Sequence, residues 1–554
     1  MNHPPAGSRW DYEVRLLAWL AVCVSILSFL FYFRHGDVLL YGDAVAHINI
    51  ARRVFDSKTP GLLQLGTVWL PLPHLLMIPF LISDEMWQRG AGGSFPSLVA
   101  YVFGVIGMFR LVRGVLSRQG GAAASIAAWT AALVYGANPN LIYMQSTAMG
   151  EALYLAFFIW AVVYFSEFVL GERKALFKCG FCLAAACLTR YDGWFLAAGM
   201  VVGAAVVAHL CQERKDEAPK FSDSRSAIVK FVLVAVAAPA LWLGYNAAVY
   251  RNPLEFANGP YSAKAIEQRT QSAGSVGHPG SGNLYVAGLY FLKSAEANVA
   301  ENVWLQRLWM LLALAAAVLT VTPHLRNERE DEAPGFVLWM PLLFLLLPLP
   351  FYALSVAYGG VPIFIPAWWP FTHYNVRYGL QLLPAFAAAV GVVVYVALRS
   401  RGKNKLRGGA VLAVIAVLVA SYASIWQAGP VCLREAQINM RGRVALQQQL
   451  AGWLHALPPD STLLMYLGGY PGAVQQAGIP LRRVINEGNH RVWKQPADPD
   501  GLWERALADP AKFADYALAF DGDSVWQAVQ GQHVKELVEI KVTGQPRAIL
   551  YKLR

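Results

Sequence analysis

The chain has 554 residues, of which 56% are hydrophobic and only 15% are charged. Soluble domains carry about 25% charged residues, so most of this chain does not face water. Its formal charge of +11 comes from basic residues in short loops between apolar runs, which argues against nucleic-acid binding. Five of the six cysteines lie in or beside these runs, so we expect no disulfide framework.

Apolar runs recur along the chain, and each is long enough to cross a hydrocarbon core about 30 Å thick. Lys and Arg cluster in alternate loops, and the positive-inside rule places those loops in the cytoplasm together with the N-terminus. We expect about eleven transmembrane helices, at 16–33, 96–116, 122–137, 151–170, 176–189, 194–210, 228–249, 303–321, 336–354, 377–398 and 409–426. The extracytoplasmic segments are then 34–95, 138–150, 190–193, 250–302, 355–376 and everything after 427.

The apolar segment 70–82 is the one run that could alter this topology. It is about 13 residues long, whereas a spanning helix needs about 17 or more, and it contains three prolines. Counting it as a span would also place the later basic loops outside the cytoplasm. We therefore predict an interfacial or re-entrant helix, so that 34–95 forms one long external segment.

The tail of the chain changes character after residue 427. Its apolar runs shorten to strand length, at 462–466, 483–486, 516–520 and 549–553. Helical stretches and glycine turn signals lie between them. We predict a polytopic α-helical membrane module at 1–427 followed by a small extracytoplasmic α/β domain at 428–554, which is an ordinary size for a domain.

Asp43 and His47 lie directly after the first apolar run, where the chain leaves the membrane. Four residues apart on a helix, they would share one face. Carboxylates close to a membrane rarely lack a function, so we expect Asp43 to take part in chemistry at the interface. Alternatively, Asp43 caps the N-terminus of the helix that follows, and the two roles do not exclude each other.

Three further external positions combine charge with a helix end. Glu151 opens a predicted span, where the helix dipole favours an acid, or it is a second carboxylate that faces Asp43 across a cavity. Arg190 and Asp192 lie between two spans with almost no loop, and they either pair with each other or leave Arg190 to bind phosphate. Arg377 either binds phosphate as well, or its long side chain simply reaches to the membrane surface.

The external loop 256–283 contains Lys264 and Arg269 and is rich in glycine towards its end. Such composition predicts mobility, and long loops of this kind are often functional. We expect a lid that becomes ordered when a ligand binds, with a plain connector as the alternative. Lys264 and Arg269 are external cations that could stabilise a departing phosphate.

The layout and several short motifs resemble the GT-C membrane glycosyltransferases. The nearest relatives are the bacterial family 39, or protein mannosyltransferase-like, and aminoarabinose-transferase-like enzymes. The likeness covers the whole chain in layout, and in residues it rests on the motifs 41–47, 148–151, 188–194, 259–264 and 377–384.

This resemblance implies an inverting transfer of a sugar from a polyprenyl-phosphate carrier to an acceptor hydroxyl outside the cytoplasm. The acceptor would be a glycan, lipid or protein, and the enzyme would lie in a bacterial inner membrane. Asp43 would be the general base, with Glu151 as a second acid. Many relatives have Asp-Glu at the first site, whereas this chain has Asp43-Ala44 with His47 one turn later.

This pattern does not decide whether the protein uses a metal cofactor. Because the family has metal-dependent and metal-independent members, a divalent cation such as Mn²⁺, Mg²⁺ or Ca²⁺ held by Asp43, His47 and Glu151 is one of two alternatives. The reaction itself needs a carboxylate to take the proton of the acceptor hydroxyl.

Two other functions compete with glycosyl transfer. The first is a transporter or flippase for a lipid-linked or small polar substrate. Transporters tend to show inverted repeats and charged or broken helices at mid-membrane, whereas the ionisable residues here gather at the outer rim. The second is a non-catalytic scaffold, which would have no reason to place acids and cations together on the outer face.

Overall fold

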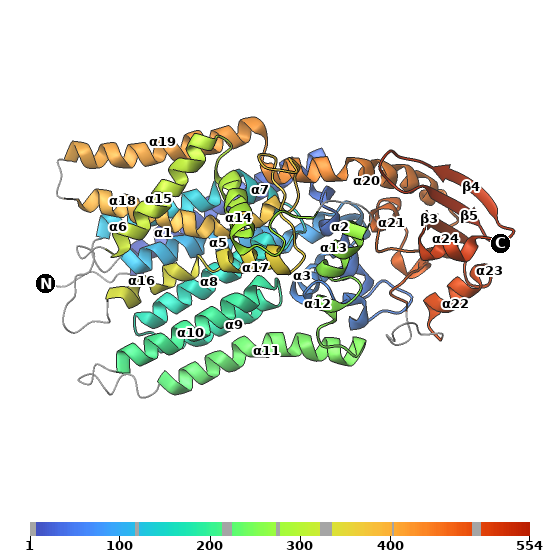
Figure 1. Ribbon diagram of the computed structural model, residues 1–554, viewed down its shortest axis with the longest axis horizontal. Helices are drawn as coiled ribbons and strands as arrows, with labels where there is room; N and C mark the ends of the chain where they lie inside the picture. Colours follow the sequence, from blue (N-terminus) through green and yellow to red (C-terminus); the bar gives the residue numbers. More distant parts are fainter. Residues whose placement is uncertain are drawn as a thin grey trace.

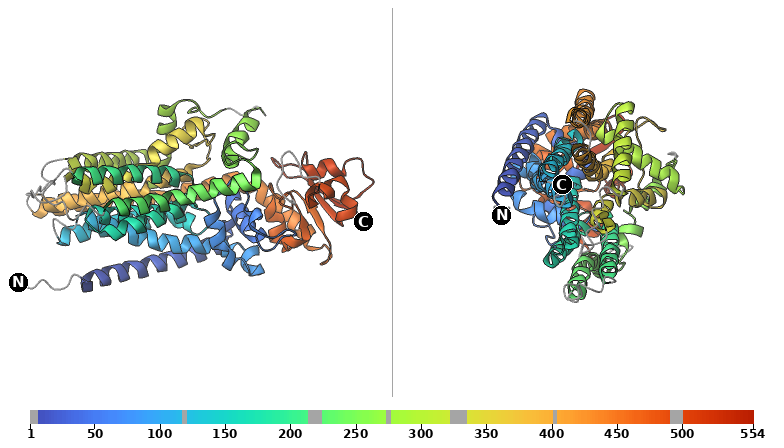
Figure 2. Two further views of the ribbon diagram at one scale, coloured as in Figure 1. Left: turned by 90° about the horizontal axis from the view of Figure 1, so that it is seen from below. Right: turned by 90° about the vertical axis from the view of Figure 1, so that its left-hand side faces the viewer.

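The computed structural model describes residues 7–116, 121–212, 224–272, 277–321, 335–400, 404–489 and 500–554. The molecule is elongated, with most of its long helices running along the long axis and a small sheet domain at one end (Figure 1). The start of the first helix, α1 (Gly7–His35), and the C-terminus lie at opposite ends of this axis (Figure 2).

Within the described residues, nine helical segments are long and apolar enough to cross a membrane. They comprise α1 (Gly7–His35), α5 (Ala91–Leu116), α8 (Glu151–Val169), α10 (Asp192–Gln212), α11 (Ser224–Tyr250), α15 (Val303–Val321), α16 with α17 (Gly335–Phe344 and Pro348–Tyr358), η7 with α18 (Val376–Leu382 and Leu383–Arg399), and α19 with α20 (Asn404–Ala428 and Val431–His455). At the other two expected positions lie α6 (Gly121–Gly136) and α9 (Arg173–Cys187), which are shorter helices. The expected polytopic helical fold is confirmed, and the chain is an integral multi-pass membrane protein.

Close packing in the bundle depends on small residues where helices meet. Gly104 and Gly107 of α5 lie against Tyr135 of α6 and Ile159 of α8, and a Cβ at Gly107 would come within 2.8 Å of Ile159 Cγ2. Small side chains let helix backbones approach closely in a membrane, where apolar burial alone does not drive association. As a result α5, α8 and α18 are the most buried spans.

The segment between α1 and α5 folds into short helices. They are η1 (Asp37–Leu39), α2 (Gly42–Arg53), η2 (Leu62–Leu65), α3 (Pro71–Met77), η3 (Ile78–Phe80) and α4 (Asp84–Gln88). At about 1.5 Å per residue, the helix formed by α3 and η3 is far too short to cross a bilayer, so the segment 70–82 is not a span.

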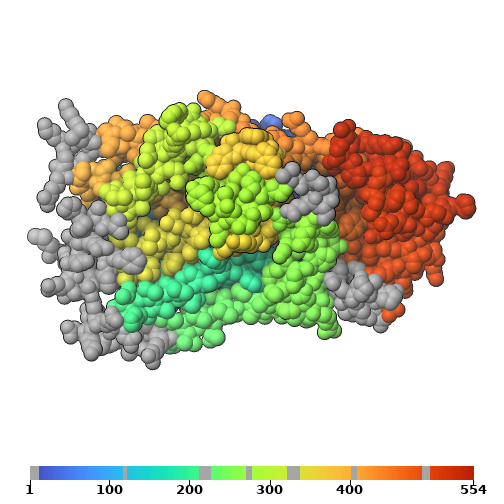
Figure 3. Space-filling view, viewed as in Figure 1, coloured from blue at the N-terminus to red at the C-terminus, as the bar shows by residue number. Residues whose placement is uncertain are grey.

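Four more helices lie outside the nine spans and pack near their ends. They are α7 (Pro139–Gln145), α12 (Glu255–Asn258), α13 (Ala263–Ser272) and α14 (Leu284–Val299). The helices α12 and α13 belong to the expected lid, of which residues 273–276 lie outside the described part of the chain. In Figure 3 the green surface of this region lies beside the C-terminal domain.

The C-terminal domain contains a five-stranded sheet with the order β2-β1-β3-β5-β4. The strands are β1 (Leu463–Met465), β2 (Val484–Ile485), β3 (Tyr516–Phe520), β4 (Lys535–Ile540) and β5 (Ala548–Lys552). β1 pairs in parallel with β2 and β3, whereas β5 is antiparallel to β3 and β4. Helices α21 (Pro471–Ala477), η8 (Leu481–Arg483), α22 (Leu502–Ala508), α23 (Pro510–Phe513) and α24 (Ser524–Val529) accompany the sheet.

The α/β character of this domain is confirmed, but β4 was not expected from the sequence. It is an edge strand, and three of its six side chains are exposed and charged. Natural sheets often protect an edge with charged side chains, which hides the apolar signal used to find strands.

The helix that carries Asp43 is anchored to the C-terminal domain. Asn49 of α2 donates a hydrogen bond to Gln475 Oε1 of α21 at 2.6 Å. Just beyond α2, the buried carboxylate of Asp56 accepts the backbone N–H groups of Leu481 and Arg482, each at 3.2 Å. Buried polar groups need such partners, so α2 and the sheet domain are held in a fixed relation.

Candidate active site

A cavity of about 690 Å³ lies where the ends of the membrane helices meet the C-terminal domain. Its walls come from the start of α2, residues 68–69, α13, the segment 360–378 and one face of α20. Aromatic and polar side chains alternate around it, and Asp43 is one of the lining residues. A concave site with a few convergent polar groups is the usual form of a substrate site.

Asp43 is an accessible carboxylate of this cavity, whose lining also includes the half-buried Glu267 of α13. Its side chain is 43% exposed, and its Oδ2 accepts a hydrogen bond from Arg377 Nη2 at 2.7 Å. The helix α2 begins at Gly42 with Tyr41 as its N-cap, so Asp43 is not the cap but an acid of the first turn. The helix dipole stabilises an acid there.

Arg377 is buried beneath Asp43 and is bound on every side. Asn375, in the left-handed conformation with φ of 56°, directly precedes η7, which carries Arg377. The Nε of Arg377 donates to Glu151 Oε1 at 3.2 Å, and its Nη1 donates to Glu435 Oε1 at 2.9 Å. The rings of Tyr41 and Tyr378 lie 5.0 Å from the guanidinium on either side. This environment fixes the cation that faces Asp43.

Arg190 forms a second, more enclosed ion-pair cluster behind the first. Its Nη1 donates to Glu151 Oε1 at 3.2 Å and its Nε donates to Asp192 Oδ2 at 3.3 Å. Tyr352 completes it, because its hydroxyl accepts from Arg190 Nη2 at 2.8 Å and donates to Asp192 Oδ2 at 3.0 Å. Glu151 therefore joins the two arginines, and its side chain is only 1% exposed.

The structure thus brings together five of the residues predicted from sequence. They are Asp43, Glu151, Arg190, Asp192 and Arg377.

His47 lies one turn beyond Asp43 on α2 but pairs with another histidine. Its Nδ1 is 2.8 Å from His74 Nε2 of α3, so one nitrogen donates to the other and at least one ring is neutral. Burial lowers the pKa of His47, and the nearby Asp43 carboxylate opposes this shift. Burial also lowers the pKa of His74, and His47 lowers it further. The two rings therefore join α2 to α3, and at least one of them supplies no positive charge.

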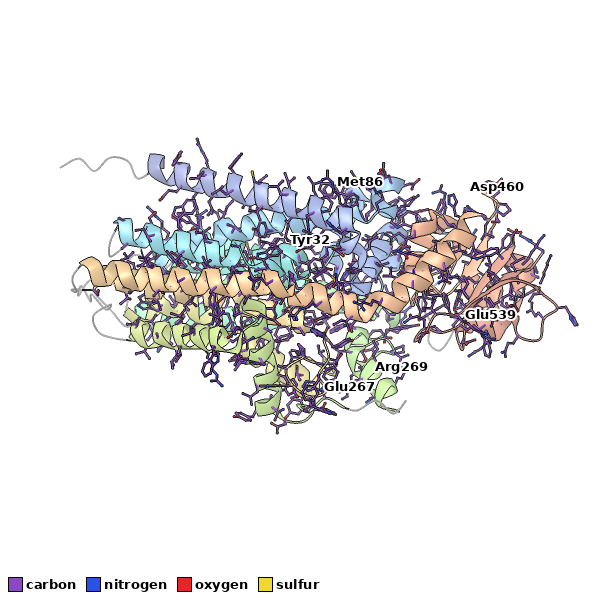
Figure 4. The ribbon with its side chains drawn as sticks, turned by 90° about the horizontal axis from the view of Figure 1, so that it is seen from above. Tyr32, Met86, Glu267, Arg269, Asp460 and Glu539 are labelled. Atoms are coloured by element: carbon purple, nitrogen blue, oxygen red, sulfur yellow. The ribbon has the colours of Figure 1, made fainter. Side chains whose placement is uncertain are left out.

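Lys264 and Arg269 are not part of the ion-pair clusters. Both are exposed on α13. Arg269 lies at the side of the molecule, between the membrane helices and the sheet domain (Figure 4). The guanidinium of Arg269 donates to the carbonyl oxygen of Pro260 at 2.7 Å. Their expected role as phosphate ligands stays a prediction.

Sequence reasoning missed Glu435, which is as buried as Glu151. Its carboxylate accepts hydrogen bonds from Arg377, from the hydroxyl of Tyr41 and from the backbone N–H of Val376. It lies near the start of α20, in a stretch of mixed polarity that gives no membrane or motif signal. Only its contact with Arg377 reveals its importance.

The residues suggested for a divalent cation do not fit one. Among the described residues no three His, Cys, Asp or Glu side chains are placed to hold a metal ion. His47 Nδ1 is bound to His74, and Glu151 Oε1 accepts from two arginines. The guanidinium of Arg377 already bridges Asp43 and Glu151, which is the position that a bridging cation would take.

No model of a known protein family and no curated protein sequence matches the chain. Solved structures are similar in fold. ArnT from Cupriavidus metallidurans bound to undecaprenyl phosphate gives a TM-score of 0.55 at 13% identity, with 99% of each chain covered. The oligosaccharyltransferase of Archaeoglobus fulgidus in its apo form gives a TM-score of 0.46 at 13% identity, covering 92% of this chain and 70% of that chain. Over nearly its whole length, the chain has the fold of ArnT, which confirms the expected membrane architecture with a C-terminal α/β domain.

Proposed function

We propose that this protein is an inverting glycosyltransferase that moves a sugar from a polyprenyl-phosphate carrier to an acceptor hydroxyl on the extracytoplasmic face of a bacterial inner membrane. The observation that carries the proposal is Asp43, a half-exposed carboxylate at a cavity, held by a buried arginine. Support for the carrier comes from the fold, which this chain shares with a protein solved with undecaprenyl phosphate bound.

Asp43 acts as the general base in this proposal. The acceptor hydroxyl gives its proton to the carboxylate as its oxygen forms a bond to the anomeric carbon. The bond between that carbon and the carrier phosphate oxygen breaks, and the bonding electrons leave with the phosphate. Attack on the side opposite the phosphate inverts the anomeric centre.

Arg377 has two tasks beside this base. Its hydrogen bond to Asp43 fixes the orientation of the carboxylate, and its positive charge lies at the cavity where the phosphate leaves. Fixed positive charge near a developing anion stabilises the transition state. Glu151 and Glu435 keep the guanidinium in place, with Arg190 and Asp192 behind Glu151.

Lys264 and Arg269 could add positive charge from α13, which contributes lining residues to the cavity. Because the described residues do not fit a divalent cation, no step of this mechanism passes through a metal ion.

The test is sugar transfer in membranes that contain the protein, with radiolabelled polyprenyl-phosphate sugars as donors. We compare the intact chain with Asp43→Asn and with the control Asp460→Asn, which changes an exposed aspartate of the C-terminal domain (Figure 4). Transfer by the intact chain and the control, lost in Asp43→Asn at equal expression, supports the proposal. Failure of the intact chain to use any such donor would overturn it and favour the transporter.

A further inference from the structure

Arg443 on α20 is, with Arg377, one of the two arginines among the described residues that line the cavity, and neither the sequence motifs nor the proposed mechanism uses Arg443. It lies on the same face of α20 as Ala436, Asn439 and Met440, which also line the cavity. Its side chain is half-buried, so the guanidinium is at the wall of the cavity rather than free in water.

The guanidinium of Arg443 lies directly against the residue before Asp43. A Cβ placed on Gly42 would be 2.5 Å from Arg443 Nη1 and 3.6 Å from its Cζ. The backbone of Gly42 is helical, so glycine is not required there by its φ angle. The small residue instead leaves the space that the guanidinium fills beside the proposed base.

Arg443 differs from Arg190 and Arg377 in its partners. Arg190 contacts two carboxylates and Arg377 contacts three. Within the described part of the chain, Arg443 has no carboxylate within ion-pair distance, and its recorded contact is the ring of Tyr470 at 5.4 Å. Stacking on an aromatic face holds a guanidinium in position without using its N–H groups.

A half-buried guanidinium with free donors matches one ligand chemistry best. Its planar fork of N–H groups fits the oxygens of a phosphate. The proposed reaction brings a phosphate into this cavity with every donor molecule, whereas the chemistry of the acceptor is not fixed. We infer that Arg443 binds the phosphate of the polyprenyl-phosphate donor, an inference that rests on the proposed function.

Gly42 is part of the same arrangement. Since Arg443 fills the space beside its Cα, an alanine at this position would push the guanidinium away from the start of α2 while leaving the arginine in the chain. Gly42→Ala, which displaces the guanidinium, and Arg443→Gln, which removes its charge, should therefore both weaken phosphate binding.

The experiment measures binding of undecaprenyl phosphate and of undecaprenol to the purified full-length protein in nanodiscs, without any turnover. The intact chain should prefer the phosphate lipid, and Arg443→Gln should weaken binding of that lipid alone by about tenfold or more, as expected for a lost charged hydrogen bond. Gly42→Ala should also weaken binding of undecaprenyl phosphate. Arg441→Gln, an exposed arginine of the same helix, is the matched control and should bind like the intact chain.

The outcomes separate this inference from the function on which it rests. If the intact chain prefers undecaprenyl phosphate and Arg443→Gln keeps the full preference, with thermal melting unchanged, the role of Arg443 is wrong while the carrier stands. If the intact chain does not distinguish the two lipids, the proposed carrier fails and the inference fails with it. Loss of sugar transfer in Asp43→Asn with undecaprenyl phosphate binding retained would show that the base and the phosphate site are separate.

Discussion

The ion-pair clusters have two ends that use the same kinds of side chain in different surroundings. At the buried end, formed by Glu151, Arg190, Asp192 and Tyr352, each charge faces another inside the protein. At the cavity end, formed by Asp43, Arg377 and Glu435, one carboxylate is 43% exposed while its partners stay buried. Access to the cavity, rather than charge, therefore separates the group proposed to react from the groups that hold it.

The sharpest test of this comparison is a pair of isosteric substitutions, Asp43→Asn at the cavity end and Asp192→Asn at the buried end. Asp43→Asn should lower kcat by about 10²–10⁴-fold, the usual contribution of a general base, with little change in stability. Asp192→Asn should mainly lower stability. Equal losses of kcat at equal stability would remove the distinction between the two ends.

Arg377→Ala should give the largest loss of stability. It leaves the buried carboxylates of Glu151 and Glu435 without their shared cation, and breaking a buried pair costs about 3–5 kcal/mol. The free energy of unfolding in mild detergent measures this loss, with Arg441→Ala as a surface control. An Arg377→Ala protein as stable as the parent would show that the carboxylates do not depend on this cation.

Glu435→Gln should cost about 2 kcal/mol of unfolding free energy, since hydrogen bonds to charged groups contribute about 1.5–3 kcal/mol. It should also lower kcat about tenfold, because Arg377 then holds Asp43 less firmly. Glu539→Gln breaks an exposed ion pair with Arg547 at the sheet (Figure 4) and should change stability much less, because solvent screens exposed charges. If Glu435→Gln lowered the free energy of unfolding no more than Glu539→Gln does, Glu435 would not support Arg377 as proposed.

The His47–His74 pair predicts a dependence of stability on pH. Burial lowers the pKa of both rings, so below about pH 6.5 the unfolded chain binds more protons than the folded one. The free energy of unfolding should therefore fall as the pH drops from about 6.5, by at most about 1.4 kcal/mol per pH unit for each histidine. His74→Gln should flatten the profile measured between pH 7.5 and 5.5, and an unchanged slope would show that this ring is not responsible.

Tyr352→Phe tests the buried end with the smallest change. It removes a hydroxyl that joins Arg190 to Asp192 and should cost about 1 kcal/mol of stability. The KM and kcat of sugar transfer should stay within about twofold, because this residue lies behind the cavity. A large fall in kcat would mean that the buried end takes a direct part in the reaction.

Much of this arrangement could be predicted from the sequence because its signals are local. Each spanning helix appears as an apolar run, and Asp43, Glu151, Arg190 and Arg377 stand beside such runs on the side assigned to the exterior. Charged residues at the rim of apolar runs stand out against their neighbours. The positions of these four residues were found in this way.

The missed residues lack such a contrast. Glu435 is separated from Arg377 by 58 positions and lies in a helix of mixed polarity, so nothing nearby marks it as buried. His74 lies in a proline-rich apolar segment and meets His47 only through the tertiary fold. Arg443 is an ordinary basic residue of a polar helix until the cavity and Gly42 are seen beside it.

The anchoring of α2 to the C-terminal domain affects how the protein unfolds. Asp43 of this helix lines the cavity, and Asn49 of the same helix is hydrogen-bonded to Gln475. Asp56, which lies just beyond the end of the helix, accepts hydrogen bonds from the backbone of residues 481–482. The surface that carries the proposed base and the sheet domain therefore share one structural element and should unfold in a single transition. Deleting the C-terminal domain should not leave a smaller active protein, because it would remove the contacts that hold the helix of the proposed base in place.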